Sequence, residues 1–106
     1  MAFFALEQLI NLYDGYRRQF VVDRREYLLI QEEGQLYLLQ ASCPHLHWPL
    51  LSAGIHGRNI YCPKHGMAFD LLSGRPANER ALGCKPLQVF TPAYEGMSVG
   101  LWLDSD

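Results

Sequence analysis

The sequence lacks features that would place it in several classes of protein. It has no apolar run near the ~20 residues that a membrane-spanning helix needs. Its apolar N-terminal stretch has no basic head and is interrupted by Glu7, so it is a poor signal peptide. It has no basic excess either, since nine Lys and Arg stand against eleven Asp and Glu, a formal net charge of -2. We therefore expect no membrane partner, and no nucleic acid bound through its phosphates.

Cysteine is scarce, and its number is odd. Three cysteines cannot form a purely disulfide-based framework, and free thiols are typical of a reducing compartment. We expect a cytoplasmic protein whose thiols are available to bind metal. The length of 106 residues, with 49% hydrophobic and 19% charged residues, suits one folded domain spanning residues 1–106.

Short apolar runs predict strands in the first half of the chain. Residues 26–31 and 35–40 are apolar on both faces, which suits strands buried between packed layers. Gly34, in the polar stretch between them, can adopt the positive φ of a tight hairpin turn. The sequence therefore predicts a buried β-hairpin in this region.

The C-terminal pattern alternates, as in a strand with one buried face. Residues 97, 99, 101 and 103 are aliphatic or Met and lie on one face. We expect residues 87–91 to pair with this strand, and residues 92–96 to form the connecting turn. Only residues 3–12 could hold a helix, and they have no clear cap. The predicted fold class is all-β.

Residues 41–86 differ from the rest, because they hold five of the six prolines and most of the Cys and His. Cys43-Pro44-His45 is followed, after a spacer of sixteen residues, by Cys62-Pro63-Lys64-His65. Thiolate and imidazole suit zinc, copper or iron–sulfur centres rather than magnesium or calcium. One zinc ion could take all four ligands, although common zinc spacings place two cysteines on one arm and two histidines on the other. Arms that each carry one Cys and one His suit a two-iron cluster with both cysteines on one iron and both histidines on the other.

This segment resembles the cluster-binding part of the Rieske [2Fe-2S] family. The resemblance implies a small all-β sandwich with a cluster-binding subdomain, about residues 41–86, at one tip. It also implies one [2Fe-2S] cluster bound by Cys43, His45, Cys62 and His65. The landmarks that carry the resemblance are, in order, Cys43-Pro44-His45, Leu50, Gly54-Ile55-His56-Gly57, Ile60-Tyr61-Cys62-Pro63-Lys64-His65-Gly66, Phe69-Asp70 and Ser73-Gly74.

Departures from the respiratory members of the family narrow the subtype. Those proteins carry an extra, disulfide-forming Cys beside each ligand pair, where this chain has His47 or Trp48 and Lys64. Met67 stands where they have a hydroxyl that stabilises the reduced cluster. The chain thus resembles a soluble, lower-potential Rieske-type ferredoxin of a ring-hydroxylating oxygenase system. Such a protein carries electrons from a flavin-dependent ferredoxin reductase to the oxygenase terminal component and is not itself an enzyme.

Two other functions stay open at this point. The chain could be the small Rieske subunit of a nitrite-reductase-like complex, which would copurify with a large partner. It could also be a structural zinc-binding module, which would be colourless. No general base, nucleophile or substrate pocket is visible in the sequence, so we expect no catalytic residue in this chain.

Several residues outside the predicted ligand set also need an interpretation. His47 is either a competing ligand or a solvent-facing loop residue, and His56 reads as an exposed turn residue. Cys84 is either a partly buried small side chain or part of a third loop, residues 83–86, that covers the cluster. For Trp48 three roles are considered: shielding the cluster from water, docking a partner protein, or packing under the first ligand loop. A solvated surface is expected for four arginines, Arg17, Arg18, Arg24 and Arg25.

Overall fold

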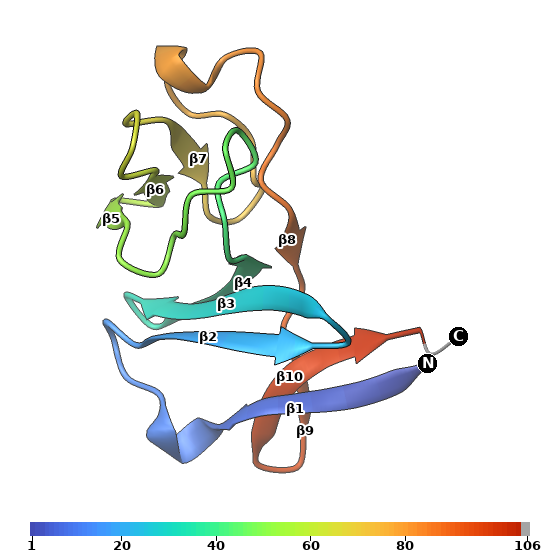
Figure 1. The fold of residues 1–106 in the computed structure, drawn as a ribbon. Coiled ribbons are helices and arrows are strands. Elements are labelled where there is room, and N and C mark those ends of the chain that lie inside the picture. Colours follow the sequence, from blue (N-terminus) through green and yellow to red (C-terminus); the bar gives the residue numbers. More distant parts are fainter. Residues whose placement is uncertain (105–106) are drawn as a thin grey trace.

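The computed structural model describes residues 1–104, and its fold consists almost entirely of antiparallel strands (Figure 1). Two single-turn 3-10 helices, η1 and η2, interrupt the strands. The elements in chain order are β1 (Ala2–Gln8), η1 (Leu9–Asn11), β2 (Arg17–Val22), β3 (Arg25–Glu32), β4 (Gln35–Gln40), β5 (Gly54–His56), β6 (Asn59–Tyr61), β7 (Ala68–Asp70), η2 (Glu79–Ala81), β8 (Val89–Phe90), β9 (Ala93–Glu95) and β10 (Ser98–Leu103). The predicted all-β fold class is confirmed. Within residues 1–104, no helix is long and apolar enough to cross a membrane.

Within residues 1–104 the strands form three sheets, of which the second contributes to both hydrophobic cores. The strand orders are β1-β10-β9, β2-β3-β4-β8 and β5-β6-β7. One face of β3 and β4 packs with the β1-β10 sheet through Tyr27, Leu29 and Leu38, which share a core with Val99 and Leu101. The other face packs with the β5-β6-β7 sheet, through Leu28, Ile30, Leu39, Ile60 and Phe69. This placement explains why these two strands are apolar on both faces.

The predicted hairpin of β3 and β4 is confirmed. The two strands pair from Tyr27 with Gln40 to Glu32 with Gln35. The connecting turn has only two residues, Glu33 at φ 51° and Gly34 at φ 76°. Positive φ at both positions is the geometry whose twist matches that of the flanking strands.

The predicted pairing near the C-terminus is wrong. β10 pairs with β9, so residues 93–95 and not residues 87–91 form its hairpin partner. The turn is Gly96-Met97, with Gly96 at φ 59°, and it follows Pro92 rather than containing it. β8, within residues 87–91, pairs instead with β4 in the next sheet. A two-residue turn connects β9 to β10, and it is shorter than the predicted turn of residues 92–96. The alternating pattern alone does not indicate the length of the turn.

The helix considered for residues 3–12 is also wrong. Residues 2–8 form β1, which pairs with β10, and only the single turn η1 follows it. β1 passes so close to β10 that a Cβ at Gly100 would overlap the Phe4 carbonyl oxygen and lie 2.8 Å from its carbon. Pairing with a strand at the far end of the chain thus overrides the local apolar pattern.

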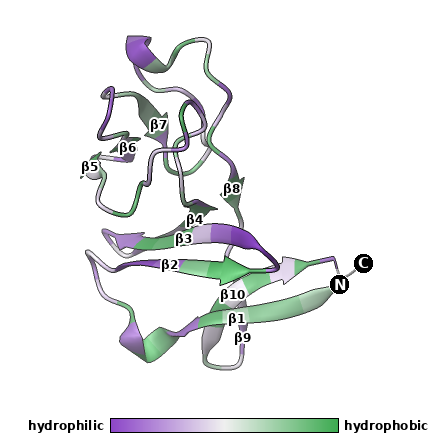
Figure 2. Ribbon diagram, in the orientation of Figure 1, coloured by the Kyte–Doolittle hydropathy of each residue, from purple (hydrophilic) through white to green (hydrophobic). Residues whose placement is uncertain are grey.

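Residues 41–86 connect β4 to β8 and make up the end of the molecule opposite β1 and β9; we call this end the tip (Figure 1). Figure 2 shows η2, at this end, as hydrophilic, and most of β1 as hydrophobic. Arg17 on β2 holds the tip in place by donating to the carbonyl oxygens of Leu51, at 3.2 Å, and Ala53. The expectation that Arg17 forms part of a solvated surface is therefore wrong.

Candidate metal centre

Two loops at the tip have the same backbone hydrogen bonds. We name them the first Cys–His loop (residues 43–48) and the second Cys–His loop (residues 62–67). In each, the N–H of the leading cysteine donates to the carbonyl five residues later, and its carbonyl accepts from the N–H four residues later. The bonds are Cys43 N to Trp48 O at 2.7 Å, His47 N to Cys43 O at 2.7 Å, Cys62 N to Met67 O at 2.7 Å and Gly66 N to Cys62 O at 2.9 Å. Each loop thus holds its cysteine at the base of a closed turn.

The fifth residue of each loop is in the left-handed region of φ. Gly66 has φ 67° and His47 has φ 58°, so His47 is the positional equivalent of a glycine. Its side chain is exposed to solvent, as the solvent-facing interpretation expects. A glycine at position 66 serves the turn of the backbone, since a Cβ there would lie 3.7 Å from its nearest neighbour, an atom of Arg80.

The two leading cysteines are buried and lie side by side. The exposed fraction is 0% for Cys43 and 3% for Cys62, and both thiols are free. Burial raises the pKa of the Cys43 thiol, and the adjacent Cys62 thiol raises it further. The backbone N–H groups of His45 and Leu46 point at the Cys43 sulfur and act in the opposite direction. Thiolates in this place would be stabilised by a bound metal and by those two amides.

The two histidines of the loops also lie side by side, but at the surface. The ring centroids of His45 and His65 are 5.8 Å apart, with an angle of 79° between the planes. Both side chains are exposed. Among residues 1–104, no three His, Cys, Asp or Glu side chains gather around one point where a single metal ion could bind. The four predicted ligands therefore form two pairs, a buried thiol pair and an exposed imidazole pair.

This donor set fits a [2Fe-2S] cluster of the mixed type. Such a cluster takes two thiolates on one iron and two imidazoles on the other. Two thiolates bring the formal charge of an oxidised two-iron, two-sulfide core to about zero, whereas four would bring it to about -2. A centre near zero charge is compatible with thiols that are shielded from water.

Asn78 fixes the second Cys–His loop, and the sequence interpretation missed it. Its Oδ1 accepts from the N–H groups of Ala68 and Ala81, both at 3.1 Å, and its Nδ2 donates to the Gly66 carbonyl at 2.8 Å. One side chain thus caps η2 and holds the loop that carries His65. An Asn directly before a short helical segment is a recognisable N-cap signal, and this was the signal available in the sequence.

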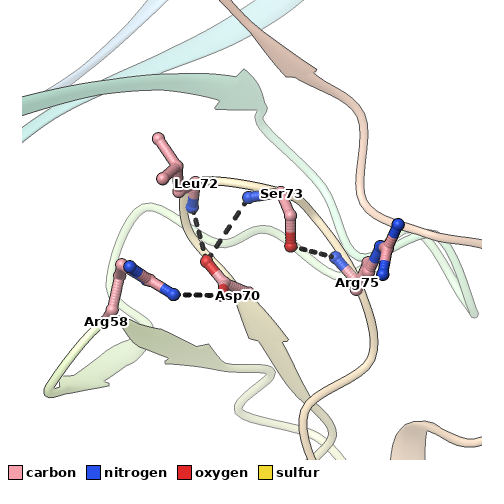
Figure 3. Close-up of polar contacts among 5 residues, drawn as sticks. All are labelled: Arg58, Asp70, Leu72, Ser73 and Arg75. Carbon is pink, nitrogen blue, oxygen red and sulfur yellow. Dashed lines mark hydrogen bonds and ion pairs between the residues drawn. The ribbon is translucent and has the colours of Figure 1, made fainter.

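The landmark residues Asp70 and Ser73 form a turn within the tip (Figure 3), and Gly74 follows them in the chain. Asp70 accepts from the N–H groups of Leu72 at 2.7 Å and Ser73 at 3.3 Å, and from Arg58 at 3.1 Å. Burial alone would raise the pKa of Asp70, but these hydrogen bonds outweigh it and hold the pKa below its usual value. Gly74, at φ 77°, accepts from the Leu87 N–H at 2.8 Å. Asp70 and Gly74 therefore anchor the backbone of the tip.

The third loop, residues 83–86, lies closer to the site than its sequence position suggests. Cys84 is partly buried, and its Sγ is 3.7 Å from the Met67 Sδ in the second Cys–His loop. The third loop and His45 line one cleft of about 760 Å³. Cys84 thus packs as a small side chain beside the site, while its loop forms one wall of that cleft.

The side chains of Trp48 and His56 both lie at the surface. Trp48 is 42% exposed, and the Lys64 Nζ lies 5.1 Å from the centroid of its ring. Trp48 therefore does not pack under the first Cys–His loop but bridges the two loops at the surface. His56 is exposed, as expected, and its ring contacts Tyr61 edge-on with centroids 5.6 Å apart.

The fold is that of the small iron–sulfur ferredoxins. The chain resembles the ferredoxin of carbazole 1,9a-dioxygenase from Nocardioides aromaticivorans IC177, with a TM-score of 0.79, 23% identity, and coverage of 94% of this chain and 96% of that one. The Sphingomonas yanoikuyae B1 ferredoxin gives a TM-score of 0.83 at 19% identity, covering 97% and 100%. The ferredoxin in a complex of reduced oxygenase and oxidized ferredoxin in carbazole 1,9a-dioxygenase gives 0.77 at 25% identity, covering 91% and 97%.

The family model of the Rieske [2Fe-2S] domain matches residues 3–94, and the chain belongs to this family. The resemblance inferred from the sequence is thereby confirmed. Apoptosis-inducing factor 3 of Homo sapiens is 28% identical over 64 residues, which are 60% of this chain. The same values hold for the Mus musculus protein. The match spans only 11% of the length of these curated relatives.

Proposed function

We propose that this protein is a Rieske-type ferredoxin that carries single electrons from a flavin-dependent ferredoxin reductase to the terminal component of an oxygenase. One [2Fe-2S] cluster would be held by the thiols of Cys43 and Cys62 and the imidazoles of His45 and His65. The observation that carries the proposal is the pairing of two equivalent loops, which place two thiols together inside and two imidazoles together outside. Membership of the Rieske family supports the cofactor.

Different residues of the chain have different roles in the proposed electron carrier. The bound cluster would accept and release one electron. Burial of Cys43 and Cys62 keeps water from the sulfur ligands, and the N–H groups of His45 and Leu46 stabilise negative charge on the Cys43 sulfur. The exposed rings of His45 and His65 form the surface that a redox partner can contact. We propose no catalytic residue, in keeping with a carrier rather than an enzyme.

Partner, domain and location belong to the same proposal. The 25% identical ferredoxin occurs in a complex with an oxygenase, and this supports an oxygenase as the electron acceptor. The free thiols among the described residues support a cytoplasmic location. We propose that residues 1–106 act as one domain, with residues 41–86 as its cluster-binding subdomain.

The test is the composition and spectrum of protein purified anaerobically from iron-replete cells. We expect a red-brown protein with two irons and two acid-labile sulfides, and a paramagnetic signal that appears on chemical reduction. A colourless protein with one zinc ion would overturn the proposal in favour of the zinc module. A coloured protein that copurifies stably with a large partner would instead indicate a subunit of a nitrite-reductase-like complex.

Variants of His65 and Cys84 test the ligand set. His65→Cys should shift the absorption spectrum toward that of an all-thiolate cluster or abolish cluster binding, and His65→Ala should lose the native spectrum. Cys84→Ser is the matched control, because Cys84 lies beside the site, with its Sγ 3.7 Å from the Met67 Sδ, without being one of the proposed ligands, and its iron content should stay unchanged. An unaltered cluster in His65→Ala, or loss of iron in Cys84→Ser, would show that the ligand set is different.

A further inference from the structure

Charge is divided unevenly between the two ends of the molecule. Residues 41–86 contain five Lys or Arg and two Asp or Glu, a net charge of +3. The remaining residues contain four Lys or Arg and nine Asp or Glu, a net charge of -5. The small overall charge of -2 therefore conceals a dipole whose positive end is the tip.

Three of the cationic side chains belong to the loops and the cleft that contain His45 and His65; we call Lys64, Arg80 and Lys85 the cationic rim. Arg80 donates through Nη1 to the His65 carbonyl at 3.2 Å. Lys64 directly precedes His65 in the chain. Lys85 lines the same cleft as Arg80 and His45. All three side chains are exposed, so their charge reaches the solvent next to the histidines.

No carboxylate neutralises the cationic rim within the part of the chain that the structure describes. The two ion pairs there are Arg18 with Glu7, at 3.6 Å, and Arg58 with Asp70, at 3.1 Å. Glu79 lies beside Arg80 on η2 and is the one acidic residue of that helix. Three cations against one carboxylate leave a positive potential over the imidazole pair.

Exposed apolar side chains lie among these cations. Leu46, next to His45, is 56% exposed, and Leu82, in the wall of the cleft, is 69% exposed. An apolar centre with a charged border is the composition of a transient protein–protein interface. The cationic rim would then select a partner by charge, while the leucines make the close contact.

We propose, on the basis of the electron-carrier function proposed above, that the tip docks onto an acidic surface of its redox-partner protein. The rim residues pair with carboxylates of that partner, and the dipole turns the tip toward it during the encounter. Electrostatic steering of this kind raises association rates by about 10- to 1,000-fold and weakens as salt increases.

The test uses small oxidants of opposite charge as probes of the field at the imidazole pair. The reduced holoprotein is mixed in a stopped-flow instrument with anionic hexacyanoferrate(III) or with cationic tris(phenanthroline)cobalt(III), and the recovery of cluster absorption on oxidation gives the rate. Salt is varied from about 0.01 M to about 1 M, over which the Debye length falls from about 30 Å to about 3 Å. The rim variants are Lys64→Gln and Lys85→Gln. The matched control is Arg18→Gln, which removes the same charge outside the tip, where Arg18 pairs with Glu7 of β1.

With hexacyanoferrate(III) we expect the rate to fall by about tenfold across this range of salt, and with the cobalt complex we expect it to rise. The two rim variants should weaken the salt dependence, and Arg18→Gln should leave it unchanged. A rate with hexacyanoferrate(III) that rises with salt would overturn the inference, because the net charge of the whole molecule would then dominate. Equal effects of all three variants would overturn it for the same reason.

A second measurement does not depend on electron transfer. The chain has two tryptophans, Trp48 beside Lys64 at the tip and Trp102 on β10 at the other end. In the Trp102→Phe variant, iodide should quench the remaining fluorescence more strongly than caesium, and in Trp48→Phe the order should reverse. Stronger quenching of Trp48 by caesium would overturn the inference. A preparation without a reducible cluster would count against the electron-carrier function alone, since this measurement would still report the charge of the tip.

Discussion

Replacing Gly74 by Ala should destabilise the protein far more than the same change at Gly34. The two glycines have nearly equal backbone conformations, with φ of 77° and 76°, so the strain that an L side chain adds is about 1 kcal/mol at each. They differ in the space around them. A Cβ at position 34 would meet no atom within 4 Å, whereas a Cβ at position 74 would overlap the Leu87 carbonyl oxygen and lie 3.0 Å from its carbon.

The additional cost at position 74 follows from the contacts of its backbone. The Leu87 carbonyl has to move, which is an overpacking penalty of about 1–3 kcal/mol. The movement also weakens the hydrogen bonds from the Leu87 N–H to the Gly74 carbonyl and from the Gly74 N–H to the Asp70 carbonyl, at 2.8 and 2.7 Å. Each such bond contributes about 1 kcal/mol. We therefore expect Gly74→Ala to lower the free energy of unfolding by about 4 kcal/mol, against about 1 kcal/mol for Gly34→Ala.

Thermal unfolding followed by circular dichroism and by cluster absorption measures both effects. A loss of 1 kcal/mol lowers the midpoint by about 4–8 °C in a domain of about 60–100 residues. Gly34→Ala should show a shift of about that size, and Gly74→Ala should show one several times larger, with early loss of the cluster absorption. Equal shifts for the two variants would refute the reasoning, because strain alone would then account for both.

Three further changes test other contacts. Asn78→Asp keeps the acceptor oxygen of the cap but removes the N–H that reaches the second Cys–His loop, so it should cost about 1–3 kcal/mol and speed cluster loss to a chelator. Tyr16→Phe removes the hydroxyl donor to Glu7. Hydrogen bonds from Asn11 and Tyr16 hold the pKa of Glu7 below 4.5. The difference in unfolding midpoint between Tyr16→Phe and the parent protein should therefore be full at pH 7 and shrink as the pH falls below 4.5. Burial raises the pKa of Tyr16 from 10.0 to about 12. The parent protein should therefore lose stability as the pH rises from 10.0 to about 12, and Tyr16→Phe should lose less. Arg17→Met removes both hydrogen bonds from the Arg17 Nη1 to the tip backbone and should lower the free energy of unfolding in urea by about 1–3 kcal/mol; an unchanged midpoint would contradict the role of Arg17.

Local signals in the sequence were sufficient for the β3-β4 hairpin and for the two Cys–His pairs. The hairpin depends on a two-residue turn and on side chains of adjacent strands, which the sequence displays in one continuous stretch. The Cys–His pairs depend on short spacings within each loop. The hairpin could be predicted because its interactions join residues close together in the chain, whereas the ligand role of the two Cys–His pairs stays a prediction.

Features that depend on distant pairing could not be predicted in this way. β1 is a strand because Ala2 pairs with Leu103, at the opposite end of the chain. The structural role of Arg17 could not be predicted, because its acceptors lie 34 and 36 residues away in the chain. They are backbone carbonyls, so no side chain in the sequence indicates them. Periodicity describes only which face of an element is apolar, so it is silent about which strand or carbonyl lies opposite.

The two Cys–His loops have equivalent backbones, but the histidine stands at a different place in each. The histidine is the third residue of the first loop and the fourth residue of the second, yet the backbone closes the same way in both. An approximate internal repeat thus presents the proposed ligands in an asymmetric register, and the turn accommodates either a glycine or His47 at its left-handed position. The metal-binding properties of this centre can consequently change through single side-chain replacements, without any redesign of the main chain that supports them.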